Sequence, residues 1–206
     1  SYAWSPATGL SNSAIYNPVF TPSAPGIYTY SVMITSSFGC THTDAISILV
    51  NPLPAITASS ANTICPGNVN STTLTAASST AINYTWSPAA SLNNSIISNP
   101  IATPPATPGT YPYVVVVTDA NGCTNSATAY VHVGTQPVAM AIYTQSVTCE
   151  GISIQFSDAS TNATTWHWDF GDGSSPSTQA DPTHLFPYNG IYNVTLTVTN
   201  PPCSDN

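Results

Sequence analysis

In the stretch Gly190-Ile-Tyr-Asn-Val-Thr-Leu-Thr-Val198, apolar and polar residues alternate without a break from Tyr192 to Val198. Successive side chains on a β-strand point to opposite faces, so this pattern predicts a strand with one buried face. The same alternation recurs at residues 28–35, 46–50 and 152–156, and at 111–117, where Val114 and Val116 make the second face apolar as well. No segment shows a helical period, and turn pairs such as Pro25-Gly26 and Asn121-Gly122 separate the runs. The sequence therefore predicts an all-β chain.

The strand belongs to an internal repeat of about 82 residues. Its opening Gly-x-Tyr recurs twice upstream, and a Trp precedes each copy at a nearly constant distance. A Cys closes each copy. The recurring residues are Trp4, Trp86 and Trp168, then Tyr28, Tyr111 and Tyr192, then Cys40, Cys123 and Cys203. Such self-similarity at a fixed period indicates tandem domains of one architecture.

Short alternating strands at this spacing indicate immunoglobulin-like β-sandwiches in tandem, arranged as a rod. We expect each repeated Trp to fill the space between two sheets. We expect each repeated Tyr to form a tyrosine corner, in which the phenol hydroxyl bonds back to the preceding turn. The candidate core residues are Trp4, Trp86, Trp168, Tyr28, Tyr111 and Tyr192.

The repeat divides the chain into three predicted domains. Residues 1–51 form a partial repeat without its first strands, 52–134 a complete repeat, and 135–206 a repeat without its last strand. Short proline-bearing linkers, Asn51–Pro54 and Gly134–Pro137, join them and are expected to resist bending. We expect further repeats on both sides, in a longer polypeptide. The alternative is that neighbouring subunits donate the missing strands.

Charge is the unusual feature of the composition. Only 4% of the 206 residues are charged, Lys and Arg are absent, and the formal net charge is −8. Nucleic-acid binding and attraction to anionic lipid both use basic side chains, so the sequence argues against both. The sequence contains no run of about 20 apolar residues, so it does not predict membrane insertion. Packing, backbone hydrogen bonds and disulfides must stabilise the fold.

The five cysteines allow two pairing schemes. Pairing inside each domain would join Cys65 to Cys123 and Cys149 to Cys203, leaving Cys40 for a partner elsewhere. In an immunoglobulin-like sandwich, however, the first turn and the turn after the sixth strand lie at opposite ends, and disulfide Cα atoms must come within about 7 Å. A staggered bond, Cys65–Cys203, would instead join neighbouring domains, and we favour it slightly. Either scheme implies an oxidising compartment.

The third repeat resembles the PKD (polycystic kidney disease) domain. The resemblance rests on Trp168-Asp-Phe-Gly-Asp-Gly173, Asp181-Pro-Thr-His-Leu-Phe186 and the stretch at 190–198, and it covers about residues 136–206. It implies an immunoglobulin-type sandwich that serves as a spacer or binding module on cell surfaces or in secreted proteins.

The first two repeats resemble the PKD-like repeats of very large surface proteins from gliding or type IX-secreting Bacteroidetes. The matching residues are Tyr84-Thr-Trp-Ser-Pro88, Asn99-Pro100 and Thr118-Asp-Ala-Asn-Gly-Cys-Thr124. Both repeats lack the Asp-x-Gly-Asp-Gly turn of the third. The resemblance implies an adhesin or a surface filament, although similar repeats also occur beside catalytic domains.

Few residues could carry chemistry. Asp158, Asp169 and Asp172 offer oxygen ligands to Ca²⁺, but carboxylates that accept backbone N–H bonds in turns explain them better. The histidines show no metal-ligand spacing; we expect His184 to pack or bond locally, and His42 and His132 to be exposed on strands. Trp166 points to the same face as Trp168. We expect it in the core, and the alternative is an exposed platform for sugars.

Together these features predict a structural segment of a long extracellular adhesin or filament, without catalytic residues or a cofactor. Its expected partners are neighbouring repeats of the same polypeptide, surface polysaccharide, or other copies of the filament. The alternative is a spacer or carbohydrate-binding module of a secreted polysaccharide-degrading enzyme. The full polypeptide would distinguish the two functions. Thousands of residues of repeats would favour the first, and a catalytic domain would favour the second.

Overall fold

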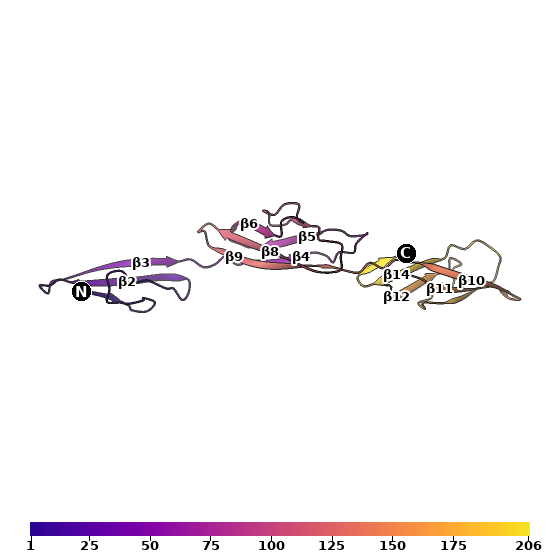
Figure 1. The fold of residues 1–206 in the computed structure, drawn as a ribbon, viewed down its shortest axis with the longest axis horizontal. Helices are drawn as coiled ribbons and strands as arrows, with labels where there is room; N and C mark the ends of the chain where they lie inside the picture. The colour runs from indigo at the N-terminus through magenta and orange to yellow at the C-terminus, as the bar shows by residue number, and fades with distance from the viewer. The chain divides into compact units, whose positions relative to one another are not determined.

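The computed structural model describes all residues 1–206 and is built of strands alone (Figure 1). Fifteen strands form five three-stranded sheets. No helix is long and apolar enough to cross a membrane. The all-β fold class predicted from the alternating pattern is confirmed.

The first sheet contains β1 (Tyr2–Ser5), β2 (Gly26–Thr35) and β3 (Thr41–Val50), in that order. Both pairings are antiparallel, and Trp4 lies opposite Val32. The ring of Phe20, in the loop after β1, packs against Tyr30 of β2 with ring centroids 5.4 Å apart. Trp4 is half-buried.

The second repeat is a sandwich of two sheets. One has the order β4-β5-β7, with β4 at Thr57–Ser60, β5 at Thr72–Ala77 and β7 at Ile101–Ala102. The other has the order β6-β8-β9, with β6 at Ala81–Ser87, β8 at Gly109–Asp119 and β9 at Thr124–Val133. The fully buried side chains include Leu74, Trp86, Tyr113 and Val115. Pro112 lies on the exposed face of β8.

The third repeat has the same plan. Its sheets are β10-β11-β13, with bounds Ala141–Thr148, Gly151–Asp158 and Thr183–Phe186, and β12-β14-β15, with bounds Thr165–Asp169, Thr195–Asn200 and Cys203–Asp205. The core cluster is Ile154, Phe156, Trp168, Phe170, Phe186, Leu196 and Val198. The short strand β15 pairs with Val198, Thr199 and Asn200 of β14.

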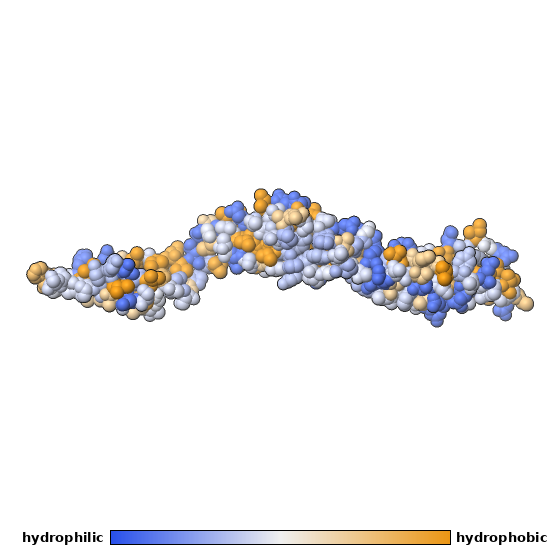
Figure 2. All heavy atoms as spheres, viewed as in Figure 1, coloured by the Kyte–Doolittle hydropathy of each residue, from blue (hydrophilic) through white to orange (hydrophobic).

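By compactness the chain forms two units. The first contains Ser1–Ile56, Ser78–Asn83 and Val116–Asn125, and the second contains the rest. These limits cut through β8, so they differ from the sequence-repeat boundaries, and the division into three domains stays a prediction. Within each part, orange apolar residues interrupt the polar surface (Figure 2).

The repeated tyrosines are half-buried, and each closes a turn in the same way. The hydroxyl of Tyr28 donates to the carbonyl of Ala24 at 2.7 Å. The equivalent bonds run from Tyr111 to Thr107 at 2.9 Å and from Tyr192 to Tyr188 at 3.0 Å. All three span four residues, which is the geometry of a tyrosine corner before a late strand.

The repeated tryptophans differ in their hydrogen bonds. The indole Nε1 of Trp4 donates to the carbonyl of Ile15, and that of Trp86 to the carbonyl of Ile97. Trp168 is as deeply buried as Trp86, but its Nε1 has no hydrogen-bond acceptor. The third repeat has a different sequence after its Trp, so the carbonyl used by the other two is not brought to the indole.

Candidate functional site: a disulfide junction between repeats

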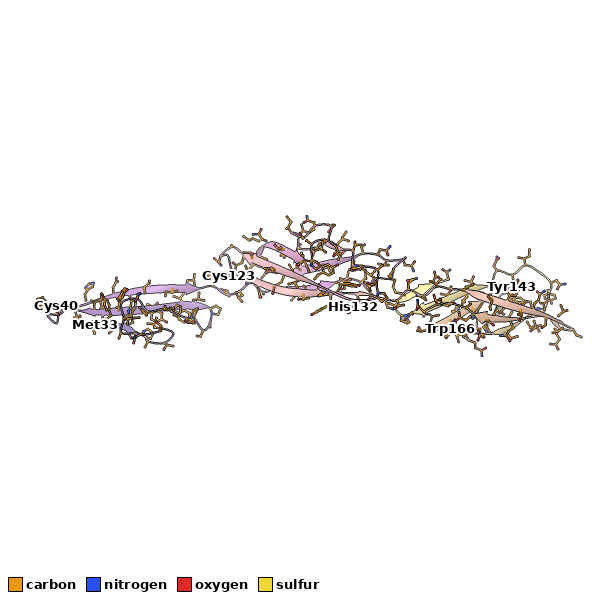
Figure 3. The ribbon with its side chains drawn as sticks, viewed as in Figure 1. Met33, Cys40, Cys123, His132, Tyr143 and Trp166 are labelled. Carbon is orange, nitrogen blue, oxygen red and sulfur yellow. A yellow bond between two sulfur atoms is a disulfide. The ribbon has the colours of Figure 1, made fainter.

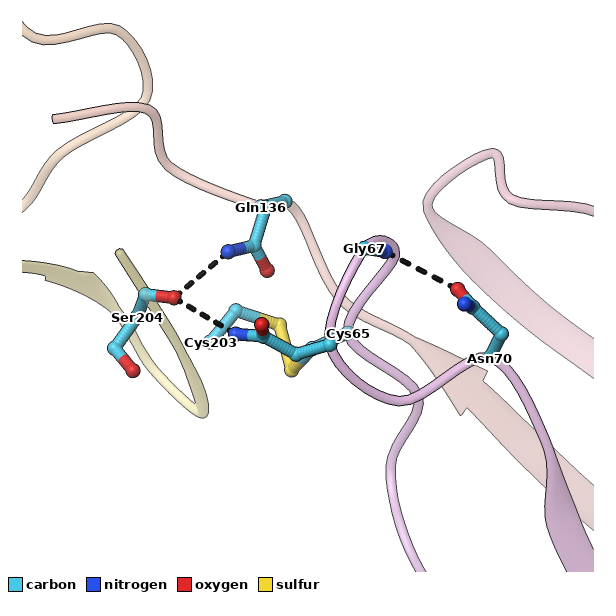
Figure 4. Close-up of a disulfide and its surroundings, with 7 residues drawn as sticks. Cys65, Gly67, Asn70, Gln136, Cys203 and Ser204 are labelled. Carbon is cyan, nitrogen blue, oxygen red and sulfur yellow. Dashed lines mark hydrogen bonds between the residues drawn. A yellow bond between two sulfur atoms is a disulfide. The ribbon is translucent and has the colours of Figure 1, made fainter. Parts of the chain in front are cut away.

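A disulfide joins the second repeat to the third. Cys65 precedes β5 and Cys203 begins β15, and their Cα atoms lie 5.4 Å apart across 138 residues of sequence (Figure 4). Both cysteines are buried, with 8% and 1% of their surface exposed. This is the staggered bond; the alternative bonds Cys65–Cys123 and Cys149–Cys203 are absent.

Hydrogen bonds converge on the residue next to the disulfide. The carbonyl of Ser204 accepts from Nε2 of Gln136 at 2.7 Å and from Nδ2 of Asn68 at 3.2 Å (Figure 4). Asn68 belongs to the second repeat, Gln136 to the linker and Ser204 to the third repeat. One acceptor therefore ties all three segments together.

The linker itself is fixed at both ends. The backbone N–H of Gly134 donates to the carbonyl of Ile64 at 2.8 Å, and that of Ala139 donates to the Asp205 carboxylate at 2.9 Å. Pro137, between them, is fully buried. A Cβ on Gly134 would lie 2.7 Å from Sγ of Cys203, closer than side chains approach, so only glycine fits beside the disulfide.

The junction residues were not predicted individually. Gln136 and Gly134 were recognised only as parts of a linker, and Asn68 and Ser204 were not singled out. The pattern of cysteines indicated which repeats meet, but hydrogen-bond partners 136 and 68 residues apart have no signal in a single sequence.

The three aspartates considered for Ca²⁺ each hold a turn. Asp158 accepts from the N–H of Ser160, Asp169 from that of Gly171, and Asp172 from that of Ser174. The last of these bonds is 2.9 Å long. No group of three or more His, Cys, Asp or Glu could hold a metal ion. The carboxylates are therefore occupied as turn acceptors.

Two of these carboxyl groups have lowered pKa values. The Ser174 and His184 side chains hold the pKa of Asp172 well below its usual range. Burial raises the pKa of Asp158, but hydrogen bonds from the side chain and the backbone N–H of Ser160 lower it further, so the net shift is downward. Both groups are thus kept ionised as acceptors.

His184 completes the Asp-rich turn. Its Nε2 lies 2.8 Å from Oδ2 of Asp172, and its ring stacks on Phe170 with centroids 3.9 Å apart. The edge of the ring meets Phe186. The motif residues of the third repeat thus form one packed unit that joins the β12–β13 loop to β13. This geometry accompanies a sequence match over the same segment.

Residues 134–205 match the model of the PKD domain family. The match covers the third repeat alone. Among solved structures, the chain resembles murine CEACAM1b, with 15% identity, a TM-score of 0.38, and coverage of 73% of this chain and 94% of that one. It also resembles the eight N-terminal Ig domains of Down Syndrome Cell Adhesion Molecule, with 13% identity, a TM-score of 0.46, and coverage of 100% and 36%.

A third similar structure is the I67–I69 fragment of the titin I-band, at 9% identity and a TM-score of 0.39, with 99% of this chain and 84% of that chain covered. A search of curated proteins found no match. The sequence match therefore applies to residues 134–205, and the remaining residues are described by their fold.

Trp166 lies in the third repeat on β12, two residues before Trp168 (Figure 3). It is half-buried and packs against the core cluster of this repeat. The structure thus places its indole against the core, where the sugar-platform interpretation required an open ring.

Three cysteines are free in this chain: Cys40, Cys123 and Cys149. Cys40 and Cys123 lie after β2 and β8, in the turns before β3 and β9 (Figure 3). These are the places that correspond to Cys203 of the third repeat. Cys149 lies in the β10–β11 turn and corresponds to Cys65. Each free cysteine thus corresponds in its repeat to one of the two cysteines that form the Cys65–Cys203 disulfide.

Proposed function

We propose that this chain is a structural repeat segment of a long extracellular adhesin or filament, which acts by reach and stiffness and not by catalysis. The observation that carries the proposal is the Cys65–Cys203 disulfide, which joins one repeat to the next beside their linker. A covalent bond between successive repeats would help a chain to transmit force or to keep a fixed length.

The junction supports stiffness in physical terms. A flexible linker of four residues would leave neighbouring domains free to reorient. Here the linker N–H groups, the Gln136 amide and a buried disulfide hold Gly134–Pro137 from both sides. We expect bending at this linker to require breaking several of these contacts together, and the repeats to behave as a rod.

Composition and redox chemistry support an extracellular place. Disulfides persist in oxidising compartments and are rare in the cytosol. The chain has no Lys or Arg, so proteases that cleave after these residues have no site in it. We propose that the same polypeptide supplies the main partners, namely neighbouring repeats that pair with Cys40, Cys123 and Cys149. Repeated weak contacts with surface polysaccharide would add avidity.

Single-molecule pulling from the two ends tests the mechanical role. With the disulfide intact, force passes directly from Cys65 to Cys203, and the residues between them bear no load. The bond spans 138 residues. An extended chain reaches about 3.4 Å per residue, so reduction should release about 470 Å of additional length.

The matched control is the double variant Cys65→Ser with Cys203→Ser, which should give the longer extension with or without reductant. Equal extension of the unmodified chain before and after reduction would argue against a load-bearing bond. The surface role is tested separately, by labelling intact cells of the source organism with an antibody to this chain. Antigen found only in the medium, attached to a catalytic domain, would favour the secreted-enzyme alternative.

A further inference from the structure

Val114 places an apolar side chain on the outer face of β8, where the other repeats have a hydroxyl. It lies between the buried Tyr113 and Val115, so its side chain points away from the core, and it is 37% exposed. Counted from the repeated Tyr, the equivalent residues are Ser31 in the first repeat and Thr195 in the third. The second repeat therefore differs from its neighbours on a face that its own core does not need.

β9 extends this face beside β8. The two strands are consecutive and joined by a tight turn, so they run antiparallel. Thr110 Oγ1 and His132 Nδ1 lie 2.9 Å apart, which sets the register and places Pro112 opposite Tyr130. We call the outward residues of the two strands the β8–β9 face: Thr110, Pro112, Val114, Thr128, Tyr130 and His132.

The middle of the β8–β9 face presents a proline and a tyrosine ring to solvent. Tyr130 is 56% exposed, and Pro112 opposite it is also exposed. Orange, apolar residues gather over β8 and β9 (Figure 2). In the first repeat the equivalent pair is Thr29 and Ser47, whose hydroxyls lie 3.0 Å apart and bond to each other. The second repeat lacks this polar pair, so water meets apolar surface there.

Charge distinguishes the second repeat as well. Of the eight carboxylates in the chain, Asp119 is the only one in residues 52–134, and it is 7% exposed. Residues 135–206 contain six. No residue of the β8–β9 face carries a carboxylate. Two copies of this acidic chain can therefore approach each other through this face without bringing like charges together.

We propose that the β8–β9 face binds the same face of a second copy of this chain. A two-fold axis parallel to the strands would stack Tyr130 of each copy on Pro112 of the other, and Val114 on Thr128. Two sheets that meet in this way pack about 10 Å apart through their side chains. The inference rests on the proposed filament role and deepens it, because it places the contact between neighbouring filaments.

Other partners fit this face less well. A basic protein would bind where carboxylates lie, and this face has none. An extended peptide needs a free strand edge, whereas this surface presents side chains. A saccharide would stack on Tyr130 alone, since the face has no second aromatic side chain except the His132 imidazole at its end (Figure 3). A second copy supplies an uncharged apolar surface of the same size.

Each contact is small and therefore weak. The sheet has three strands about 4.8 Å apart, and about seven residues at roughly 3.3 Å each give it a face of about 330 Å². Stable complexes bury about 800 Å² per partner. Association of single segments therefore requires a high concentration, whereas many repeats side by side would add their contacts.

Sedimentation equilibrium of the full chain tests the contact, with Cys40, Cys123 and Cys149 alkylated so that no disulfide links the copies. Self-association should appear as the protein approaches millimolar concentration. It should strengthen as salt is added, because salt screens the repulsion between the carboxylates of the two copies.

Val114→Asp should weaken this self-association by about tenfold or more, because each copy then buries a carboxylate in the contact. The matched control is Ile96→Asp, which makes the same change at a 68% exposed residue in the loop after β6 and should leave association unchanged. Tyr130→Asp repeats the test at a residue outside the core. Melting temperatures check that each variant is folded.

Amide chemical shifts recorded over the same concentrations locate the contact, and those of Val114 and Tyr130 should move. The proposal is overturned if the chain stays monomeric at millimolar concentration, or if Ile96→Asp weakens association as much as Val114→Asp. An oligosaccharide that shifts these amides in a chain that does not self-associate would also overturn it. Each of these failures would leave the pulling experiment, and with it the disulfide-based function, unaffected.

Discussion

Individual residues in this chain stabilise the fold without the usual surface charges. The only pair of a carboxylate and a basic side chain is Asp172 with His184. Local contacts must therefore come from glycines in tight sites, from carboxylates that accept hydrogen bonds in turns, and from buried aromatic rings. Gly134 illustrates the first, Asp172 the second and Trp86 the third. Each makes a contact that a conservative substitution removes.

Gly134→Ala should destabilise the junction. The added Cβ would lie 2.7 Å from Sγ of Cys203, so either the linker or the disulfide must shift. Overpacking of this kind costs about 1–3 kcal/mol. The free energy of unfolding of the oxidised protein, measured with denaturant, should fall by this amount.

Gly190→Ala is the matched control. Its Cβ would meet the ring of Tyr192 at 3.5 Å, an ordinary contact distance. Loss of stability in Gly190→Ala equal to that in Gly134→Ala would show that the disulfide contact is not the cause.

The Asp172 carboxylate should make stability depend on pH at the acid end. Its pKa is lowered in the folded protein by Ser174 and His184. A lowered folded pKa stabilises the fold above the unfolded pKa, about 3.9, and this stabilisation is lost as pH falls below it. Asp172→Asn keeps an acceptor for Ser174 but cannot ionise.

Thermal melts of both proteins between pH 6 and pH 2 measure the effect. The difference in melting temperature should be largest near pH 6 and shrink as pH falls below about 4. A difference that stays constant over the whole range would contradict the assigned role of the carboxylate.

At the scale of elements, the sequence predicted the strands well because their alternation follows directly from the pleat. The Gly-x-Tyr units predicted the hydroxyl bonds of Tyr28, Tyr111 and Tyr192, since the corner is local, spanning four residues. A repeated Trp marks the same place in every copy, but its burial depends on the residues around it. Trp4 is half-buried, whereas Trp86 is 1% exposed.

That difference predicts unequal costs for one substitution in two copies. Trp86→Ala should lower the free energy of unfolding by about 3–5 kcal/mol, because its indole is 1% exposed between two sheets. Trp4→Ala should cost clearly less, because Trp4 is half-buried. Denaturant unfolding of both variants makes the comparison.

Tyr130→Ala is the control, because it removes a large ring that is 56% exposed on β9 and lies outside the core. Equal losses for Trp4→Ala and Trp86→Ala would mean that the first sheet is covered as completely as the second.

For the whole molecule, the cysteine spacing and sandwich geometry favoured a bond between repeats, and the structure has that bond. The Asn68 and Gln136 contacts that accompany it could not be predicted, because they depend on how two folded repeats meet. The disulfide lies buried beside these contacts. The repeat also places Cys123 and Cys149 where further bonds of the same kind would form.

Non-reducing peptide mapping tests this account most directly. Trypsin has no site in a chain without Lys or Arg, so chymotrypsin and an Asp-specific protease are used on the alkylated, unreduced protein. The account predicts one linked pair containing Cys65 and Cys203, with Cys40, Cys123 and Cys149 alkylated in the isolated chain. Recovery of Cys65 joined to Cys123 would contradict it.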